Sequence, residues 1–358
     1  MQQRDYWPTH DWRTALPQEW GLDPERLTLL HEHAQGIATL HSILIVRSGF
    51  IVFEEYYHGW SQNHLHNVNS VTKSVTSALV GIALREGLLH DLDQPVLSFF
   101  PEYRPQVLDS CKQAITFRHL LSMSSGLAPM PADEIWTFLG RSASVQRLLD
   151  RPIHHEPGQL FAYDELGAHL VSLLLNRVTG MPTASFARTR LFEPLGIWRD
   201  EHGMLCPWKS GAQLADAPHP FGLWNNDEDV LWSVDRRGYH IGGFGLQLTT
   251  REMAKFGYLY LKQGQWEDQC IIPSEYVQDS WRQHSVTEKG EAYGYFWFLP
   301  QWRGHTVCCA MGFGGQLIAV VPDLALVVAI TCRPEPGILQ SRVIVRDFVL
   351  PAMERNHR

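Results

Sequence analysis

The sequence predicts an α/β (α+β) protein in which one antiparallel sheet is flanked by helices and a mostly helical lobe is inserted into the chain. Two β-rich runs in "HSILIVRSGFIVFEEYYHGW" flank Ser48-Gly49 and are typical of a hairpin. Four more runs, "YGYFWFLP", "HTVCCAMG", "GQLIAVVP" and "LALVVAIT", follow one another towards the other end. Because helical patterns lie between these two groups, the simplest packing is one sheet built from both ends of the chain.

This pattern predicts two lobes. We expect a discontinuous α/β sheet lobe over residues 1–88 and 241–358, and a mostly helical lobe over residues 89–240. A cleft between two such lobes is a natural ligand site, so we expect the active site there.

The helices of the first half are marked by their ends. Asp23 is a good N-cap before Pro24 in "LDPERLTLLHEHA", and the segment from Ser70 to about Arg85 is helical with Gly87 at its end. "ITFRHLLSMSSGL" predicts a further short helix.

The later helices follow the same logic. "DELGAHLVSLLLNRVTG" has one apolar face and ends at Gly180. Thr249 and Glu252 form a capping-box pattern for a helix that ends at Gly264, and "QSRVIVRDFVLPAM" predicts a closing helix. Residues 198–240 are rich in Trp, Gly, Asp and Pro and are interpreted as long loops over a site.

Composition excludes several classes of protein. The 358 residues carry a net charge of −8 and no long basic run, so we expect no nucleic-acid partner. The longest apolar run, "LIAVVPDLALVVAI", is interrupted by Pro322-Asp323 and is shorter than the ~20 residues of a membrane span. The start has no secretory pattern, so we expect a cytoplasmic protein with free thiols. Cys308 and Cys309 would point to opposite faces of a strand.

Ser70 and Lys73 are three residues apart at the start of a predicted helix, in "NSVTKSVTSALVG". Positions i and i+3 share a helix face, so the two side chains would lie side by side. The unpaired N–H of Ser70 and the helix dipole would both favour a developing oxyanion. A lysine whose pKa is lowered by burial can accept the proton of a serine. Ser70 is therefore a candidate nucleophile.

An ordinary structural interpretation competes with this one, because serine is a common N-cap and lysine is common on helix surfaces. The spacing alone favours that interpretation. However, the run "SVTSALVGIAL" after Lys73 is small and apolar, with no other charge before Arg85. It indicates a buried helix, in which a lysine without a partner is costly.

Other catalytic and metal-binding signatures are absent from the sequence, including G-x-S-x-G, H-E-x-x-H, C-x-x-C and the P-loop. His64 and His66 have an H-x-H spacing without an acidic residue two positions later, and we expect no zinc site there. We expect neither a metal nor an organic cofactor.

With Ser-x-x-Lys in this position, the chain resembles the serine β-lactamase and penicillin-binding-protein superfamily over nearly its whole length. The matching segments are "NSVTKSVTSALVGIALREGLL", "ITFRHLLSMSSGL", "HEPGQLFAYDELGAHLVSLLLNRVTG", "GGFGLQLTTREMAKFGYLYL" and "MGFGGQLIAVVPDLALVVAIT". The chain is most similar to the class C-like branch, which includes esterases, D-amino-acid peptidases and 6-aminohexanoate-dimer hydrolases; "GFGGQ" is most like the last group. The resemblance implies a β-lactamase/transpeptidase-like fold.

The resemblance also implies roles for individual residues. Ser70 would be the acylated nucleophile and Lys73 its immediate partner. Tyr163, in "EPGQLFAY", matches the tyrosine of the second motif, Tyr-x-Asn, and its phenol would pass the proton between Ser70 and the leaving group. A half-buried structural tyrosine is the alternative.

The second motif departs from the family at Glu165, where asparagine is usual. A carboxylate has replaced an amide that can donate a hydrogen bond. If Glu165 pairs with Lys73, the lysine stays charged and Tyr163 is the better candidate base. If Glu165 points elsewhere, the family role is lost.

The third motif departs as well, because Lys-Thr-Gly aligns with Ala310-Met311-Gly312. The missing lysine helps to bind the carboxylate of β-lactams and peptides, so its absence favours substrates without that group. The N–H of Phe313 would join that of Ser70 as the oxyanion hole, and Gly312 and Gly314 would let substrate approach the strand closely. Trp136, in "DEIWTFLG", would overhang the cleft and pack against substrate, or else be a core tryptophan.

These observations predict a serine hydrolase that acts on a small ester or amide through an acyl-enzyme, as a carboxylesterase or amidase similar to 6-aminohexanoate-dimer hydrolases. One alternative is a β-lactamase or D-amino-acid peptidase. Another is a non-catalytic binding module that retains the fold. The sequence leaves the natural substrate and the oligomeric state open.

Overall fold

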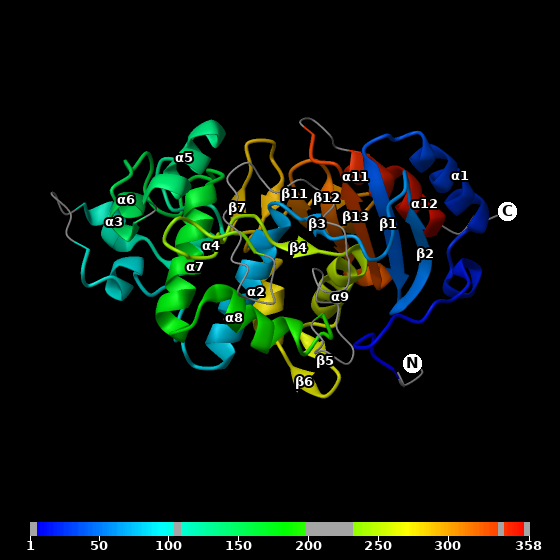
Figure 1. Cartoon of the computed structure of the whole chain (residues 1–358), viewed down its shortest axis with the longest axis horizontal. Helices are drawn as coiled ribbons and strands as arrows, with labels where there is room; N and C mark the ends of the chain where they lie inside the picture. The colour runs from blue at the N-terminus through cyan, green and yellow to red at the C-terminus, as the bar shows by residue number, and fades with distance from the viewer. Residues whose placement is uncertain (1–5, 104–108, 143, 198–231, 336–339, 354–358) are drawn as a thin grey trace.

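The computed structural model describes residues 6–103, 109–142, 144–197, 232–335 and 340–353. Its central feature is a five-stranded antiparallel sheet with the order β11-β12-β13-β1-β2 (Figure 1). The strands are β1 (Leu40–Arg47), β2 (Phe50–Tyr56), β11 (Cys308–Gly312), β12 (Gln316–Val321) and β13 (Leu326–Cys332). Because β1 pairs with β13, the two ends of the chain form one sheet, which confirms the prediction.

The hairpin between β1 and β2 turns at the predicted residues. Ser48 and Gly49 both have left-handed backbone angles, with φ of 48° and 92°. Two consecutive left-handed residues match the twist of the flanking strands, which is why Gly is favoured in such a turn.

Both faces of the sheet are covered by helices (Figure 1). One face packs against α1 (Pro24–Gln35) and a closing helical segment made of α11 (Gln340–Val343), the π-helical turn η5 (Ile344–Val349) and α12 (Leu350–Met353). The other face packs against α9 (Thr250–Leu261) and α2 (Val71–Arg85). As expected from strand alternation, Cys308 belongs to the core on one face and Cys309 to the core on the other.

The residues between the two groups of strands are mostly helical. They form η2 (Val96–Phe99), α3 (Ser110–Ala114), α4 (Phe117–Leu121), α5 (Ala132–Ser142), α6 (Val145–Leu149), α7 (Glu165–Thr179), α8 (Thr183–Ala187) and the π-helical turn η3 (Arg188–Phe192). The loops predicted over residues 198–240 lie outside the described residues as far as position 231. From Trp232 onwards the backbone forms isolated bridges, including one between Val234 and His240.

Shorter elements complete the fold. They are η1 (Pro17–Trp20), β3 (His66–Asn67), β4 (Gln247–Leu248), β5 (Gln265–Trp266), β6 (Gln269–Cys270), α10 (Ser274–Ser280), β7 (Ser285–Val286), β8 (Ala292–Tyr293), β9 (Gln301–Trp302), β10 (His305–Thr306) and η4 (Pro322–Leu324). In the described part of the chain, no helix is long and apolar enough to cross a membrane, and the five cysteines are free.

Capping residues define the helix ends where the sequence predicts them. Asp23 accepts a hydrogen bond from the backbone N–H of Glu25 at the start of α1. Thr249 and Glu252 form the reciprocal capping box of α9. Gly180 ends α7 with a φ of 66°, a left-handed angle that glycine adopts without strain.

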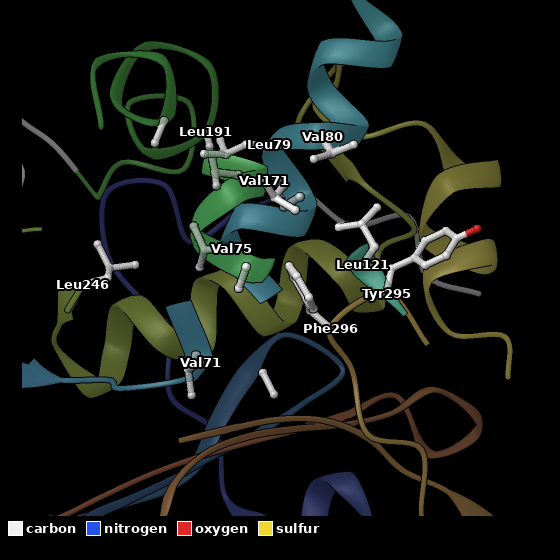
Figure 2. Close-up of a cluster of buried hydrophobic side chains, with 14 of the residues drawn as sticks. Val71, Val75, Leu79, Val80, Leu121, Val171, Leu191, Leu246, Tyr295 and Phe296 are labelled. Atoms are coloured by element: carbon white, nitrogen blue, oxygen red, sulfur yellow. The ribbon is translucent and has the colours of Figure 1, made fainter. Parts of the chain in front are cut away.

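Helix α2 is the buried helix that the apolar run after Lys73 predicts. Every residue from Val71 to Ala83 is buried. Figure 2 shows side chains of α2, such as Val75 and Leu79, packed beside Val171 of α7 in a common hydrophobic cluster. The first turn of α2 is therefore fixed by core packing on several sides.

One predicted strand is wrong. Only the ends of "YGYFWFLP" pair with other strands, through Tyr293 in β8 and an isolated bridge from Phe298 to Cys309. Between them the chain turns, because Phe296 has a φ of 60° and the N–H of Gly294 donates to the carbonyl of Trp297 at 2.8 Å. The alternating aromatic residues resemble a strand, but they are buried by a turn instead.

Candidate active site

Ser70 stands at the start of α2, yet its hydroxyl does not cap the helix. Ser70 already has right-handed helical backbone angles, and the preceding Asn69 adopts a left-handed φ of 47°. The backbone N–H of Asn69 donates to the side chain of Asn67 at 3.0 Å, which fixes this tight entry. The serine hydroxyl is thereby free for other partners, which removes the ordinary capping interpretation.

The hydroxyl of Ser70 instead faces Lys73 and Glu165. Lys73 Nζ donates to Ser70 Oγ at 2.9 Å, to Glu165 Oε2 at 2.6 Å and to the carbonyl oxygen of Gly243 at 2.8 Å. An ammonium group has three protons, and here each has one acceptor. A neutral amine would have only two protons and would turn a lone pair towards an oxygen. This arrangement therefore fits a charged lysine.

The electrostatics of Lys73 combine two opposing effects. Its side chain is 2% exposed, and this burial lowers the pKa of Lys73, since the charged form loses its hydration. The carboxylate of Glu165 opposes the shift, because it attracts and hydrogen-bonds the ammonium group. The pair thus satisfies a charge that would otherwise be costly to bury.

Tyr163 lies beside the same lysine. Lys73 Nζ is 4.8 Å from the centroid of its ring, and the ring stacks on Phe298 with centroids 6.5 Å apart. Burial raises the pKa of Tyr163 well above its usual range, and the negative charge of Glu165 adds to this, while a hydrogen bond with Ser70 opposes it. The neutral phenol is therefore the stable form of Tyr163.

Helix α7 positions Tyr163 and Glu165 through the residue between them. Asp164 caps α7 by accepting a hydrogen bond from the N–H of Leu166 at 3.1 Å, and it binds the guanidinium of Arg151 at 2.8 Å. The side chains of this ion pair are only 6% and 4% exposed. Because Asp164 is fixed by both contacts, Tyr163 and Glu165 are fixed at the N-terminus of α7, next to Lys73.

The end of β11 reaches the nucleophile from the opposite side. The side-chain amide of Asn69 donates to the carbonyl of Phe313 at 3.0 Å, so the residue before Ser70 is bound directly to the residue that follows this strand. A Cβ atom at Gly312 would lie 2.3 Å from the carbonyl oxygen of Val68, and one at Gly314, where φ is 77°, would lie 2.2 Å from Pro334. Glycine is thus required at position 312 for β11 to approach the nucleophile loop, and at position 314 for the following turn to pack against Pro334.

This geometry agrees with the comparison with known protein families. The family model described as "Beta-lactamase" matches residues 30–339, which include Ser70, Lys73, Tyr163 and Glu165. The chain belongs to the β-lactamase family. It is accordingly a serine hydrolase of the β-lactamase-like type, the class that its sequence predicts.

Individual members of the family are only distantly similar. Esterase EstB of Burkholderia gladioli is 29% identical over 150 residues, which are 38% of this chain and 38% of that esterase. A putative 6-aminohexanoate-dimer hydrolase from Bacillus anthracis is similar in structure with a TM-score of 0.71 at 16% identity, over 97% of this chain and 88% of the other. A family VIII carboxylesterase has a TM-score of 0.67 at 17% identity, over 95% of this chain and 98% of the carboxylesterase. These structural matches confirm the β-lactamase/transpeptidase-like fold.

Sequence reasoning missed one residue of this β-lactamase-family site, Gly243. Its carbonyl oxygen is the third acceptor of Lys73, and a Cβ atom there would lie 2.6 Å from Glu165 Oε2. The hydroxyl of Thr76 in α2 donates a hydrogen bond to the carbonyl oxygen of the preceding residue, Gly242, at 2.9 Å. The pair of glycines in "GGFG" was the available signal, but a backbone contact between residues so distant in sequence cannot be read from spacing.

Trp136 and His66 have different surroundings. Trp136 of α5 is half-buried and packs on Phe244, the neighbour of Gly243, with ring centroids 4.5 Å apart. His66 of β3 is buried, and its ring nitrogens lie 3.3 Å from His41 Nδ1 and from the hydroxyl of Thr331. Trp136 thus contacts the wall of the site, and His66 belongs to the sheet core.

Proposed function

We propose that this protein hydrolyses a small ester or amide through an acyl-enzyme on Ser70. The observation that carries the proposal is the hydroxyl of Ser70, which is not used as a helix cap and accepts a hydrogen bond from the buried Lys73 at 2.9 Å. A positive charge next to the attacking oxygen favours the negative charge that develops there in the reaction.

The oxyanion of the tetrahedral intermediate would be bound by the backbone N–H groups of Ser70 and Phe313. The bond between Asn69 and the carbonyl of Phe313 supports this assignment, because it holds the strand end against the loop that carries the nucleophile. The dipole of the 15-residue helix α2 would contribute in the same direction.

Tyr163 would protonate the leaving group. Its raised pKa supports this role, because a neutral phenol next to the lysine ammonium can donate a proton to a departing alkoxide or amine. Water would then release the acid from Ser70. We infer no need for a metal or an organic cofactor.

The substrate class follows from the walls of the site. β11 carries the apolar Ala310 where the family has the lysine of its third motif, and the side chain of Phe313, which is 55% exposed, follows the strand. Apolar side chains at these positions favour an uncharged acyl or alcohol group over a carboxylate. The relatives named as an esterase and a 6-aminohexanoate-dimer hydrolase support small esters or amides as substrates.

The proposal is tested with p-nitrophenyl butyrate and the variant Ser70→Ala. We expect the wild type to turn over the ester and Ser70→Ala to lose at least ~10³-fold in kcat/KM, since the nucleophile is gone. Ser98→Ala, at an exposed serine whose hydrogen bonds are with the neighbouring Pro95 carbonyl and the Gln94 side chain, is the matched control and should keep wild-type activity. Equal turnover by wild type and Ser70→Ala would overturn the assignment.

Two alternatives make different predictions. A β-lactamase or D-amino-acid peptidase would hydrolyse a cephalosporin or be labelled covalently by penicillin, and the missing lysine of the third motif predicts little of either. A non-catalytic binding module would gain no adduct on Ser70 from a fluorophosphonate probe, whereas our proposal predicts one. We also propose that the protein is cytoplasmic, acts on small molecules and has no nucleic-acid partner.

A further inference from the structure

The carboxylate of Glu165 uses its two oxygen atoms differently. Oε2 is 2.6 Å from Lys73 Nζ and is fixed by that ion pair. Oε1 faces the hydroxyl of Ser70 at 3.5 Å and is its acceptor. The side chain is 19% exposed, so water can reach this carboxylate. One oxygen is thus held by the cation, and the other is directed at the nucleophile.

The other two groups near Ser70 are poorly suited to accept its proton. All three protons of the Lys73 ammonium point at acceptors, at 2.6, 2.8 and 2.9 Å, so it has no lone pair to offer. Tyr163 is stable as the neutral phenol, which is a weak base. An ionised carboxylate has free lone pairs and acts only as an acceptor, so it can take up a proton.

We propose that Glu165 is the general base of this hydrolase, and that its Oε1 takes the proton of Ser70 during acylation and the proton of water during deacylation. This inference rests on the proposed function, because it assumes an acyl-enzyme on Ser70. It assigns a catalytic role to the residue that departs from the asparagine of the family motif.

The proton balance closes in both half-reactions. During acylation, Ser70 Oγ bonds to the carbonyl carbon and its proton moves to Glu165 Oε1. The tetrahedral intermediate collapses, the bond to the alcohol or amine breaks, and Tyr163 protonates the leaving group and regains a proton from Glu165.

During deacylation, Ser70 Oγ is an ester oxygen and no longer donates to Oε1. A water molecule takes its place, gives a proton to Oε1 and adds as hydroxide to the ester carbon. The bond to Ser70 Oγ then breaks, Oγ recovers the proton from Glu165, and the acid leaves.

The test compares two matched pairs of variants, Glu165→Gln with the wild type and Glu165→Asp with Glu165→Asn. Within each pair the side chains have equal length and each offers an acceptor to Lys73, so they share any structural damage and differ in basicity. With p-nitrophenyl butyrate, we expect kcat/KM and kcat of Glu165→Gln to be about 10²–10⁴-fold lower than those of the wild type. We also expect Glu165→Asn to be clearly slower than Glu165→Asp. A role limited to accepting a hydrogen bond from Lys73 would be preserved by the amides.

A second comparison separates the base from the acid. p-Nitrophenolate leaves without protonation, whereas ethoxide must be protonated. Tyr163→Phe should therefore lose much more activity on ethyl butyrate than on p-nitrophenyl butyrate, while Glu165→Gln should lose activity on both. The same large loss on both esters for Tyr163→Phe, with Glu165→Gln close to wild type, would assign the base to Tyr163 and overturn the proposal.

The outcome for Glu165→Asn is informative because it restores the family motif. Wild-type kcat/KM in this variant would also overturn the proposal. Failure of the proposed function itself would look different, since the wild type would then show neither ester turnover nor a fluorophosphonate adduct on Ser70.

Discussion

At the scale of single residues, the site depends on a lysine that is enclosed by oxygen atoms from three parts of the chain. Ser70 is three residues away, whereas Glu165 and Gly243 are 92 and 170 residues away. The Ser70–Lys73 pair could be predicted, because both residues share one helix face. Whether Glu165 would face Lys73 could not, because a motif does not specify the direction of a side chain. The structure supports the first of the two possibilities, a charged lysine paired with Glu165.

Gly243 offers a test at this scale. A Cβ atom there would lie 2.6 Å from Glu165 Oε2 and 3.4 Å from Lys73 Nζ, so in Gly243→Ala the carboxylate must move away from the lysine. We expect a fall in kcat/KM of about 10²-fold, the usual effect of displacing a catalytic group by ~1 Å.

Gly140→Ala is the control for that variant. Nothing lies within 4 Å of a Cβ atom at Gly140 in α5, so activity should be unchanged, and the helix should gain roughly 0.5–1 kcal/mol in stability. Ester kinetics and thermal unfolding of both variants measure these effects. Full activity in Gly243→Ala would mean that the position of Glu165 is not restricted by this glycine.

At the scale of elements, cap signals predict where helices begin and end, because they depend on local hydrogen bonds. Asp23, Gly180 and the Thr249–Glu252 box all act as their residue types suggest. The turn at Phe296 could not be predicted in this way. A Cβ atom at Gly294 would lie 2.0 Å from the carbonyl oxygen of Ser280, so this turn packs closely against another segment, a contact that the local pattern does not reveal.

The start of α7 gives a prediction for an element. Asp164→Asn keeps a good N-cap but leaves the buried guanidinium of Arg151 without its counter-ion. We expect a loss of about 3–5 kcal/mol in the free energy of unfolding, measured by denaturant titration. Asp109→Asn, at the N-cap of α3 where Asp109 accepts from the N–H of Cys111, should cost well under 1 kcal/mol. Similar losses in both variants would show that the ion pair with Arg151 contributes little.

At the scale of the whole molecule, one sheet joins the two ends of the chain, and a polar cluster is buried beside it. Ser42 of β1 hydrogen-bonds Thr331 of β13 and Thr250 of α9, at 2.5 and 2.6 Å. Thr331 in turn lies 3.3 Å from His66 Nε2, and His66 lies 3.3 Å from His41. That strands from both ends of the chain form one sheet could be predicted from the sequence pattern, but this cluster could not, because it joins four separate elements.

The cluster makes stability depend on pH. Burial lowers the pKa of His41 from 6.5 to about 4, and nearby positive charges add to the shift; they are Arg333, His58 and His64. As pH falls from about 6.5 to about 4, the unfolded chain binds a proton at this position while the folded protein does not, so the free energy of unfolding decreases. Burial also lowers the pKa of His66, in the same direction.

We expect the unfolding midpoint to fall with pH across this window, with a smaller slope in His41→Gln than in the wild type. His90→Gln, at an exposed histidine, is the control and should follow the wild-type slope. Unfolding curves at pH 7, 5.5 and 4.5 measure the effect. An unchanged slope in His41→Gln would assign the pH dependence to other groups.

The enclosure of Lys73 also has a practical consequence. Reagents that acylate amines need a neutral, accessible nitrogen, and this one is charged and fully hydrogen-bonded beneath the surface. The exposed Lys289 should therefore react before Lys73. Such chemistry could attach the enzyme to a solid support or a dye through its surface while its catalytic amine stays untouched.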